Sequence, residues 1–320
     1  MSIHKSVLLN ETIDALELKE GMVVVDATLG GGGHSREILK KIGDSGTLVA
    51  FDRDIEAIEK FTGKITDEFQ KVNDKISKIG NTFLVNENFA NLGEILNILK
   101  IKKVDAIVAD LGISSDQLDD ARRGLSFQAD ADLDMRLDRK QQKTAADVVN
   151  SYGAQELTRV LREFGDERFA ARIVQSIVSE RKQTYVASTK QLAQIVTDAV
   201  PGAYRHGKIH PATKTFQALR IEVNGELEAV KEFIPQAIEA LAPKGRLAMI
   251  AFHSGEDSIV KHMLKDFARG CICPPEFPVC RCGNKAKVKI LTGRPIVASE
   301  KELEENPRAR SAKLRIAEKL

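Results

Sequence analysis

The stretch Met22-Val23-Val24-Val25-Asp26-Ala27-Thr28-Leu29-Gly30-Gly31-Gly32-Gly33-His34 decides the fold class of this chain. It begins as a β-branched strand, passes through four glycines and enters a helical pattern that ends at Gly43. Consecutive glycines allow a tight turn whose backbone approaches a ligand closely at the start of a helix. The stretch therefore predicts a ligand-binding turn between a strand and a helix.

The same alternation of strand and helix continues through the first third of the chain. Further buried strands are expected at residues 47–52, 82–85 and 104–110, and a helix is expected to begin at Asp54. The strands at 47–52 and 104–110 each end in an acid, Asp52 and Asp110. Strands separated by helices indicate β-α-β units, so the predicted fold is α/β with a parallel sheet covered on both faces.

The alternation stops after residue 110, and the next buried strand is expected only at 245–252. The sequence between them is helical in period, at residues 145–152, 154–164, 167–182 and 188–199. We therefore predict an inserted helical domain at 115–210, within a discontinuous domain formed by 1–114 and 211–320. Two closing strands are expected at 287–291 and 311–317, with no clearly periodic helix between them.

Composition narrows the class of protein. The chain has 320 residues, of which 42% are hydrophobic and 29% charged, as in ordinary globular proteins and unlike disordered chains. It has no apolar run near the roughly 18 residues that a membrane span needs. The N-terminal residues have no signal-peptide core, so the expected location is the cytoplasm. Four cysteines are too few for a disulfide scaffold.

Charge is unevenly distributed. The net charge is +2, but residues 281–320 contain eleven Lys and Arg against five Glu and no Asp. A second basic stretch contains Arg205, His206, Lys208, His210, Lys214 and Arg220. Such patches suit a polyanion, although a solvated surface is the ordinary alternative.

A nucleoside-type cofactor site is predicted at the carboxyl ends of the strands. Asp52 follows Gly33 by nineteen residues, where nucleotide-binding sheets place an acid that binds ribose hydroxyls. The dinucleotide motif G-x-G-x-x-G is not matched, because its last glycine falls on Ser35. This favours S-adenosylmethionine over a dinucleotide, with an NAD(P)-dependent oxidoreductase as the alternative. The loop from Asp110 to Asp119 either receives substrate or supplies helix caps.

Ten segments, in order, resemble the RsmH (MraW) family of bacterial 16S rRNA methyltransferases. The segments are HKSVLL (4–9), DATLGGGGHS (26–35), FDRD (51–54), DLGISS (110–115), RGLSF (123–127), LDMR (133–136), GDERFA (165–170), HPATKTFQALRI (210–221), FHSGEDSIVK (252–261) and NPRARS (306–311). The resemblance implies a class I, Rossmann-like S-adenosylmethionine-dependent fold. It also implies methylation of the N4 amine of a cytidine in the decoding centre of 16S rRNA. The implied partner is 16S rRNA within the small ribosomal subunit, with no membrane partner, and the oligomeric state is left open.

The resemblance also implies the cofactor positions. They fall on Gly32, Gly33, His34, Asp52, Phe89, Asp110 and Gln117. The chain departs from other members at Asp116 and Gly255, neither of which is a cofactor position. We expect Asp110 to act in catalysis by orienting the cofactor or the target amine.

The sequence constrains the residues that contact the substrate less than those that bind the cofactor. The chain lacks the D/N/S-P-P-aromatic motif of many amino-methyltransferases, so the candidates for stacking on the base are Phe127, Phe216 and Phe252. Candidate phosphate or base contacts are His210, Lys214 and Arg220, with a helix-surface role as the alternative. For His253 a structural hydrogen bond is preferred over catalysis.

Cys271-x-Cys273 and Cys280-x-Cys282 form the remaining motif. Four clustered thiolates suit zinc, but C-x-C is shorter than the usual spacing, so free thiols in a proline-rich loop are preferred and no metal is predicted.

A third functional class, an assembly factor with a vestigial pocket, is disfavoured by the glycine turn and Asp52.

Overall fold

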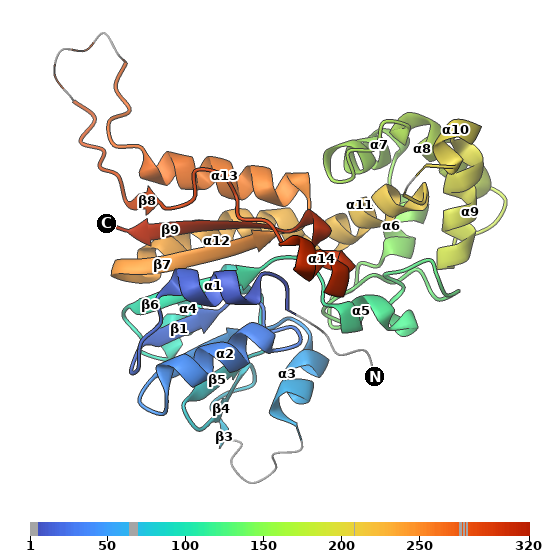
Figure 1. The fold of residues 1–320 in the computed structure, drawn as a ribbon. Coiled ribbons are helices and arrows are strands. Elements are labelled where there is room, and N and C mark those ends of the chain that lie inside the picture. Colours follow the sequence, from blue (N-terminus) through green and yellow to red (C-terminus); the bar gives the residue numbers. More distant parts are fainter. Residues whose placement is uncertain (1–5, 64–69, 208, 275–276, 278, 280) are drawn as a thin grey trace. The chain divides into compact units, whose positions relative to one another are not determined.

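The structure is a computed structural model that describes residues 6–63, 70–207, 209–274, 277, 279 and 281–320. His4, Lys5, Lys208 and Cys280 of the motifs above lie outside the described residues. The chain forms two compact units (Figure 1). The sheet unit contains residues 1–112 and 227–320, and the helical unit contains residues 113–226.

The sheet unit is built on one nine-stranded sheet in the order β3-β4-β5-β2-β1-β6-β7-β9-β8. The strands are β1 (Val23–Asp26), β2 (Thr47–Phe51), β3 (Gln70–Lys71), β4 (Ile76–Ile79), β5 (Thr82–Val85), β6 (Val104–Asp110), β7 (Leu241–Ala251), β8 (Val288–Ile290) and β9 (Lys313–Lys319). The five strands from β5 to β7 are parallel, whereas β9 runs antiparallel to both β7 and β8. The carboxyl ends of the central strands therefore meet at one edge.

Helices cover both faces of this sheet (Figure 1). Side chains alternate across each strand, so Val24 and Leu48 face a core with α1 and α2, whereas Val25 and Val49 face a core with α4, α12 and α13. The helices of this unit are α1 (Leu9–Leu16), α2 (Gly33–Ile42), α3 (Ile55–Thr62), η1 (Phe89–Asn91), α4 (Leu92–Ile98), α12 (Glu226–Ala240), α13 (Ser254–Ala268), α14 (Glu300–Glu305) and η3 (Pro307–Ser311). Among the described residues, none of the helices is long and apolar enough to cross a membrane.

The helical unit has its own core. Its elements are α5 (Ser115–Asp119), η2 (Ala121–Arg123), α6 (Ala145–Ser151), α7 (Ala154–Glu163), α8 (Ala170–Glu180), α9 (Thr189–Ala199), α10 (Gly202–Arg205) and α11 (Ala212–Asn224). Leu161, Ile173 and Val196 are buried together from three of these helices. Phe216 and Leu219 of α11 join the same core. The unit therefore extends to Glu226, whereas the sequence places the end of the insertion at residue 210, because α11 buries its apolar face among these helices.

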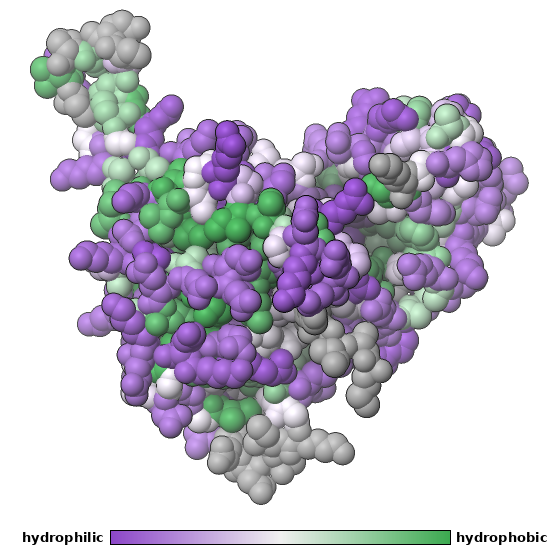
Figure 2. Space-filling model, in the orientation of Figure 1, coloured by the Kyte–Doolittle hydropathy of each residue, from purple (hydrophilic) through white to green (hydrophobic). Residues whose placement is uncertain are grey.

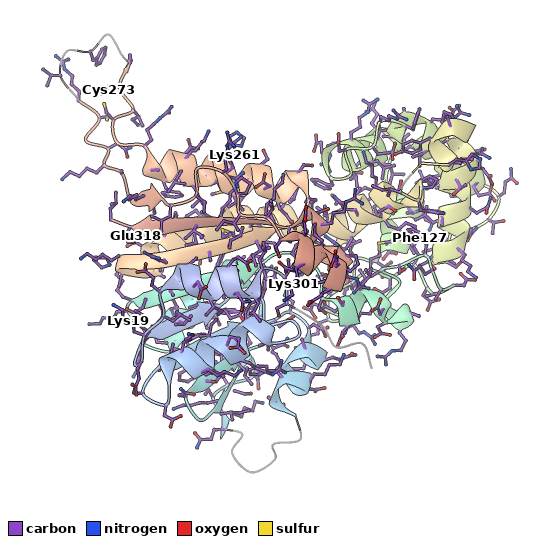
Figure 3. All side chains as sticks on the ribbon, in the orientation of Figure 1. Lys19, Phe127, Lys261, Cys273, Lys301 and Glu318 are labelled. Carbon is purple, nitrogen blue, oxygen red and sulfur yellow. The ribbon has the colours of Figure 1, made fainter. Side chains whose placement is uncertain are left out.

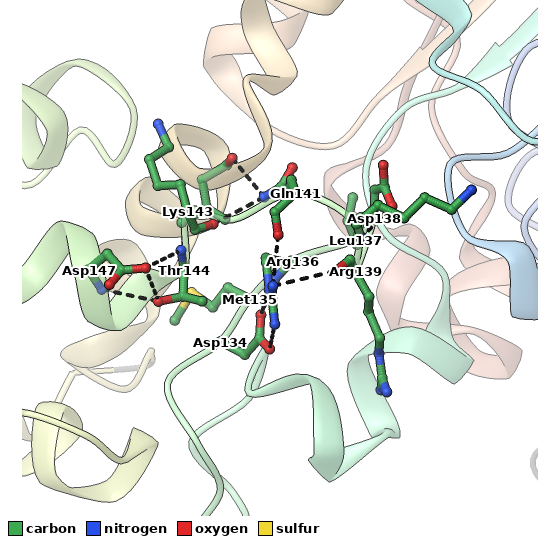
Figure 4. Close-up of polar contacts among 12 residues, drawn as sticks. Asp134, Met135, Arg136, Leu137, Asp138, Arg139, Gln141, Lys143, Thr144 and Asp147 are labelled. Atoms are coloured by element: carbon green, nitrogen blue, oxygen red, sulfur yellow. Dashed lines mark hydrogen bonds and ion pairs between the residues drawn. The ribbon is translucent and has the colours of Figure 1, made fainter.

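A network of polar contacts stabilises the long loop before α6 (Figure 4). Arg136 makes a two-pronged ion pair with Asp134 and donates to the carbonyl of Gln141 at 2.7 Å. The buried side chain of Asn224 donates to the carbonyl of Met135 at 2.8 Å and accepts from the N–H of Leu137 at 2.9 Å. The residues 133–136 thus have a structural role, because they fasten the loop to α11.

Replacing Asn224 with Ala should destabilise the helical unit. The variant leaves the Leu137 N–H and the Met135 carbonyl without their side-chain partner, which costs about 2–3 kcal/mol in the free energy of unfolding. Urea denaturation followed by circular dichroism measures the change. Gln194→Ala, at an exposed position of α9, is the control and should change stability by less than about 0.5 kcal/mol. Equal stability of Asn224→Ala and the wild type would contradict this structural role.

Candidate cofactor site

The glycine turn joins β1 to α2 at the carboxyl edge of the sheet. The N–H of Leu29 donates to the carbonyl of Phe51 at 2.7 Å, which holds the turn against the end of β2. Gly32 precedes the first residue of α2 in a left-handed conformation, with φ of 73°. A Cβ at Gly32 would collide with the ring of Phe61, and one at Gly33 with Ser6. Both positions require glycine, and no side chain caps α2, so its first N–H groups are available to a ligand.

Asp52 lies directly after β2, and its side chain connects the glycine turn to Asp54. Its Oδ2 accepts from the N–H of Gly30 at 2.8 Å, and its Oδ1 accepts from the N–H of Asp54 at 2.8 Å. Burial raises the pKa of Asp52 to about 7 despite these bonds. Each carboxylate oxygen still has accepting capacity, as binding to ribose hydroxyls requires.

Two further acids end neighbouring strands. Asp26, 1% exposed at the end of β1, accepts from Ser35 Oγ at 2.6 Å and from the N–H of Thr28 at 3.1 Å. Burial raises the pKa of Asp26 to about 6. Burial also raises the pKa of Asp110 well above its usual range, with repulsion from Asp26 and Glu256 adding to the effect. Three aspartates, at the ends of β1 and β6 and directly after β2, thus lie close enough for Asp26 to repel the charges of the other two.

His34 and Phe89 complete the expected positions in the sheet unit. His34 is buried in the first turn of α2, and its Nδ1 lies 3.8 Å from Oδ2 of Asp110. Phe89 follows β5 and packs edge-to-face on Phe233 of α12, with ring centroids 5.1 Å apart. The structure therefore places His34 beside Asp110, and the ring of Phe233 supports the ring of Phe89.

Gln117 belongs to the helical unit. Its Oε1 accepts from the N–H of Ser114 at 2.9 Å, while Ser114 Oγ accepts from the N–H of Gln117 at 3.2 Å. This reciprocal pair caps α5. The loop after β6 therefore uses Ser114 as a helix cap, and a cofactor contact by Gln117 remains a prediction.

Aromatic rings gather elsewhere in the helical unit. Phe127 stacks on His210 with centroids 4.5 Å apart, and it packs edge-to-face on Phe216 at 5.0 Å. His210 is exposed, whereas Phe216 is 4% exposed and belongs to the core. Of these rings, Phe127 and His210 can offer a flat surface to a ligand, and Phe216 supports them.

Arg220, His253 and Lys214 each have a partner within the protein. Arg220 makes a two-pronged ion pair with Glu226, with both N–O distances 2.8 Å, which favours the alternative of a structural role, and its phosphate contact remains untested. His253 caps α13, and its Nε2 lies 3.1 Å from Glu256. Lys214 donates to the carbonyl of Asp166 at 2.7 Å, yet its side chain is 37% exposed. Phe252 is half-buried against the α1–α2 side of the sheet.

Sequence reasoning did not single out Asp26, Ser35 or Glu256 as members of the site. Asp26 could have been predicted from the sequence, because it ends a strand as Asp52 and Asp110 do. Glu256 could not, because its 1% exposure and its hydrogen bond from the N–H of Phe252 depend on the tertiary fold.

The strand order, with an antiparallel β9 between β7 and β8, and the acid-lined glycine turn define a class I S-adenosylmethionine-dependent methyltransferase. The chain belongs to the MraW methylase family, which matches residues 1–320. This excludes the dinucleotide oxidoreductase alternative. S-adenosylmethionine is the cofactor of the enzyme.

Curated relatives match over nearly their whole length. "Ribosomal RNA small subunit methyltransferase H" of Brevibacillus brevis is 44% identical over 317 residues, covering 99% of this chain and 98% of the relative. The protein of the same name from Clostridium botulinum (strain Kyoto) is 46% identical over 318 residues, with 99% of both chains covered. A solved rRNA methylase from Streptococcus thermophilus covers 100% of this chain and 99% of its own at 12% identity, with a TM-score of 0.42. A likeness that weak supports no conclusion.

The site fits a cationic nucleoside cofactor on three counts. The first N–H groups of α2, next to the glycine turn, have no side-chain cap. Oδ1 of Asp110 is buried and has no hydrogen-bond partner among the described residues. The raised pKa values of Asp26 and Asp52 show that a positive charge nearby would be favourable.

Replacing Asp26 with Asn should stabilise the cofactor-free protein above about pH 7. The pKa of Asp26 is about 6 in the folded chain, against its ordinary value of 3.8, so the folded state binds more protons between these values. Wild-type stability therefore falls as the pH rises from about 4 to 6, by up to about 3 kcal/mol. Asn can still accept from Thr28 and can donate to the hydroxyl of Ser35.

Urea denaturation of both proteins at about pH 4 and pH 8 measures this difference. The variant should exceed the wild type in stability at the higher pH and match it at the lower pH. A variant that is less stable at both pH values would show that the Asp26 carboxylate contributes to folding.

Proposed function

We propose that this enzyme methylates the N4 amine of a cytidine in the decoding centre of 16S rRNA, in the cytoplasm. The observation that carries the proposal is family membership over the whole chain, with relatives named for methylation of small-subunit rRNA. The resemblance described above supplies the nucleotide and the N4 atom. The intact glycine turn and Asp52 favour an active enzyme over an assembly factor with a vestigial pocket.

We assign cofactor binding to Gly32, Gly33, His34, Asp52, Phe89, Asp110 and Gln117. In this assignment the carboxylate of Asp52 accepts from the ribose hydroxyls, and the supported ring of Phe89 lies beside the adenine. The uncapped N–H groups at the start of α2, beside Gly32 and Gly33, can donate to the cofactor. When bound, S-adenosylmethionine supplies a methyl group on a positively charged sulfur.

Asp110 is the proposed catalytic residue. Its unpartnered Oδ1 can accept a hydrogen bond from the amino group of the target base. The nitrogen lone pair of a cytosine amine is delocalised into the ring, and an acceptor on its protons helps to localise that pair. A bound positive charge would lower the raised pKa of Asp110, so the acceptor would be ionised when the cofactor is present.

The helical unit is the proposed substrate-recognition region. Its exposed His210, stacked on Phe127, offers an aromatic surface on which an extruded base can stack. The partly exposed Lys214 and the basic residues of 281–320 suit the phosphate backbone. These contacts extend beyond one nucleotide, so we expect the substrate to be folded RNA within the small ribosomal subunit.

Replacing Asp52 with Ala should lower the affinity for S-adenosylmethionine at least about tenfold, because its ribose hydrogen bonds are lost. Wild-type affinity should fall about tenfold from pH 8 to pH 6, since Asp52, with a pKa of about 7, is mostly protonated at the lower pH. The affinity of the variant should fall less over this pH range, because the contribution of Asp52 is gone. Isothermal titration calorimetry measures both effects.

Asp44→Ala is the matched control, because Asp44 is exposed before β2, at the opposite edge of the sheet. It should keep both the affinity and the pH dependence. Thermal unfolding of each variant checks that the fold is intact. Wild-type affinity that does not change between the two pH values would remove Asp52 from the site.

The reaction itself is tested by labelled methyl transfer to purified small subunits, naked 16S rRNA and an isolated hairpin. We expect N4-methylcytidine on the subunits, with kcat/KM for the hairpin lower by at least about tenfold. Digestion to nucleosides and mass spectrometry identify the product. Methyl groups found on carbon 5 would refute the assigned atom, and equal kcat/KM on all three substrates would refute recognition of the surrounding RNA.

A further inference from the structure

The segment between α13 and β8 contains all the cysteines of the chain, and the proposed function uses none of them. Cys271, Cys273 and Cys282 lie in its described part, and Figure 3 shows Cys273 on the arm that projects beside α13. Their sulfur atoms all lie within 4.8 Å of one another. Residues eleven positions apart in sequence have thus been brought together at one point.

One of the sulfur–sulfur distances matches a tetrahedral metal. The Sγ atoms of Cys271 and Cys282 are 3.8 Å apart. Two thiolates on one zinc, each at about 2.3 Å and at the tetrahedral angle, are separated by about 3.8 Å. A disulfide instead requires about 2.05 Å between the sulfurs. The observed separation therefore fits two thiolates bound to one ion.

Backbone N–H groups point at these sulfurs. Cys271 Sγ accepts from the N–H of Cys273 at 3.4 Å, and Cys273 Sγ accepts from the N–H of Arg281 at 3.3 Å. Cys282 Sγ accepts from the N–H groups of Ile272 and Asn284 at 3.4 and 3.5 Å. Outer donors of this kind stabilise the negative charge on metal-bound ligands and hold their orientation.

The described residues of the segment make few contacts that join its two sides. Near α13 its two sides are joined by the N–H of Lys287, which donates to the carbonyl of Phe267, and by Asn284, which donates to the carbonyl of Gly270. Beyond that point Ile272, Phe277 and Val279 are 58%, 50% and 68% exposed. Figure 2 shows hydrophobic residues on the surface of this projecting arm. Short segments without an apolar core are commonly stabilised by a metal instead.

We propose that Cys271, Cys273 and Cys282 bind a zinc ion that fastens this segment. Thiolate ligands favour zinc among the common divalent ions, because they are soft donors and zinc accepts tetrahedral sulfur coordination readily. A solvent molecule or another ligand fills the fourth position. Arg269, Arg281 and Lys285 follow or precede the cysteines closely and offset the negative charge of a metal–thiolate centre.

The test uses the full chain purified anaerobically without chelators and then exposed to zinc. Inductively coupled plasma mass spectrometry should find about one zinc per chain in the wild type. Replacing all three cysteines with Ser should reduce this to below about one-tenth. Val279→Ser, an exposed non-cysteine position of the same segment, is the matched control and should keep the metal.

A second readout separates loss of the site from misfolding. Cobalt substituted for zinc should show sulfur-to-metal charge-transfer absorption in the wild type, and Cys273→Ser should weaken it. The affinity for S-adenosylmethionine should be unchanged in every cysteine variant, which verifies the fold. A wild type that holds less than about one-tenth zinc after reconstitution, or a triple variant that keeps its zinc, would overturn the proposal.

Discussion

The placement of one buried and two half-buried aspartates at one edge of the sheet is the constraint on which the rest of the site depends. Parallel strands direct their carboxyl ends to the same edge, and β1, β2 and β6 each present an acid there. Backbone donors from the glycine turn and the hydroxyl of Ser35 satisfy part of this charge. Burial nevertheless raises the pKa values of Asp26 and Asp52 to about 6 and 7. The cofactor-free protein therefore carries an electrostatic cost that a positively charged ligand relieves.

The sheet unit and the helical unit have different roles, and each role follows from how the unit is packed. The sheet unit fixes the glycine turn and the acids on strand ends and helix starts, where their positions are rigid. In the helical unit the apolar residues form an independent core. Polar residues such as Asn224 and Arg136 hold the loops in place. Its partly exposed groups, chiefly His210 and Lys214, are what remains for a substrate.

The sequence predicts the centre of this fold better than its edges. The strands at 82–85 and 104–110 have the expected bounds, because buried parallel strands are continuous apolar runs. The pair β3 and β4 has no such signal, since it is short and largely polar and depends on β5 for pairing. Gly32, Gly33 and Asp52 were predictable from spacing. The partner of Arg220 was not, because Glu226 reaches it only through the turn after α11. The sulfur cluster likewise depends on how its segment folds back.

Nuclear magnetic resonance titration of the aspartate carboxyl groups tests the central claim most directly. With carboxyl-labelled aspartate, Asp26 and Asp52 should titrate near pH 6 and pH 7 in the cofactor-free protein. Both pKa values should fall when S-adenosylmethionine is added, because the bound positive charge favours the ionised forms. Carboxyl groups of Asp26 and Asp52 that titrate near pH 4 in the free protein, or that do not respond to the cofactor, would contradict the account.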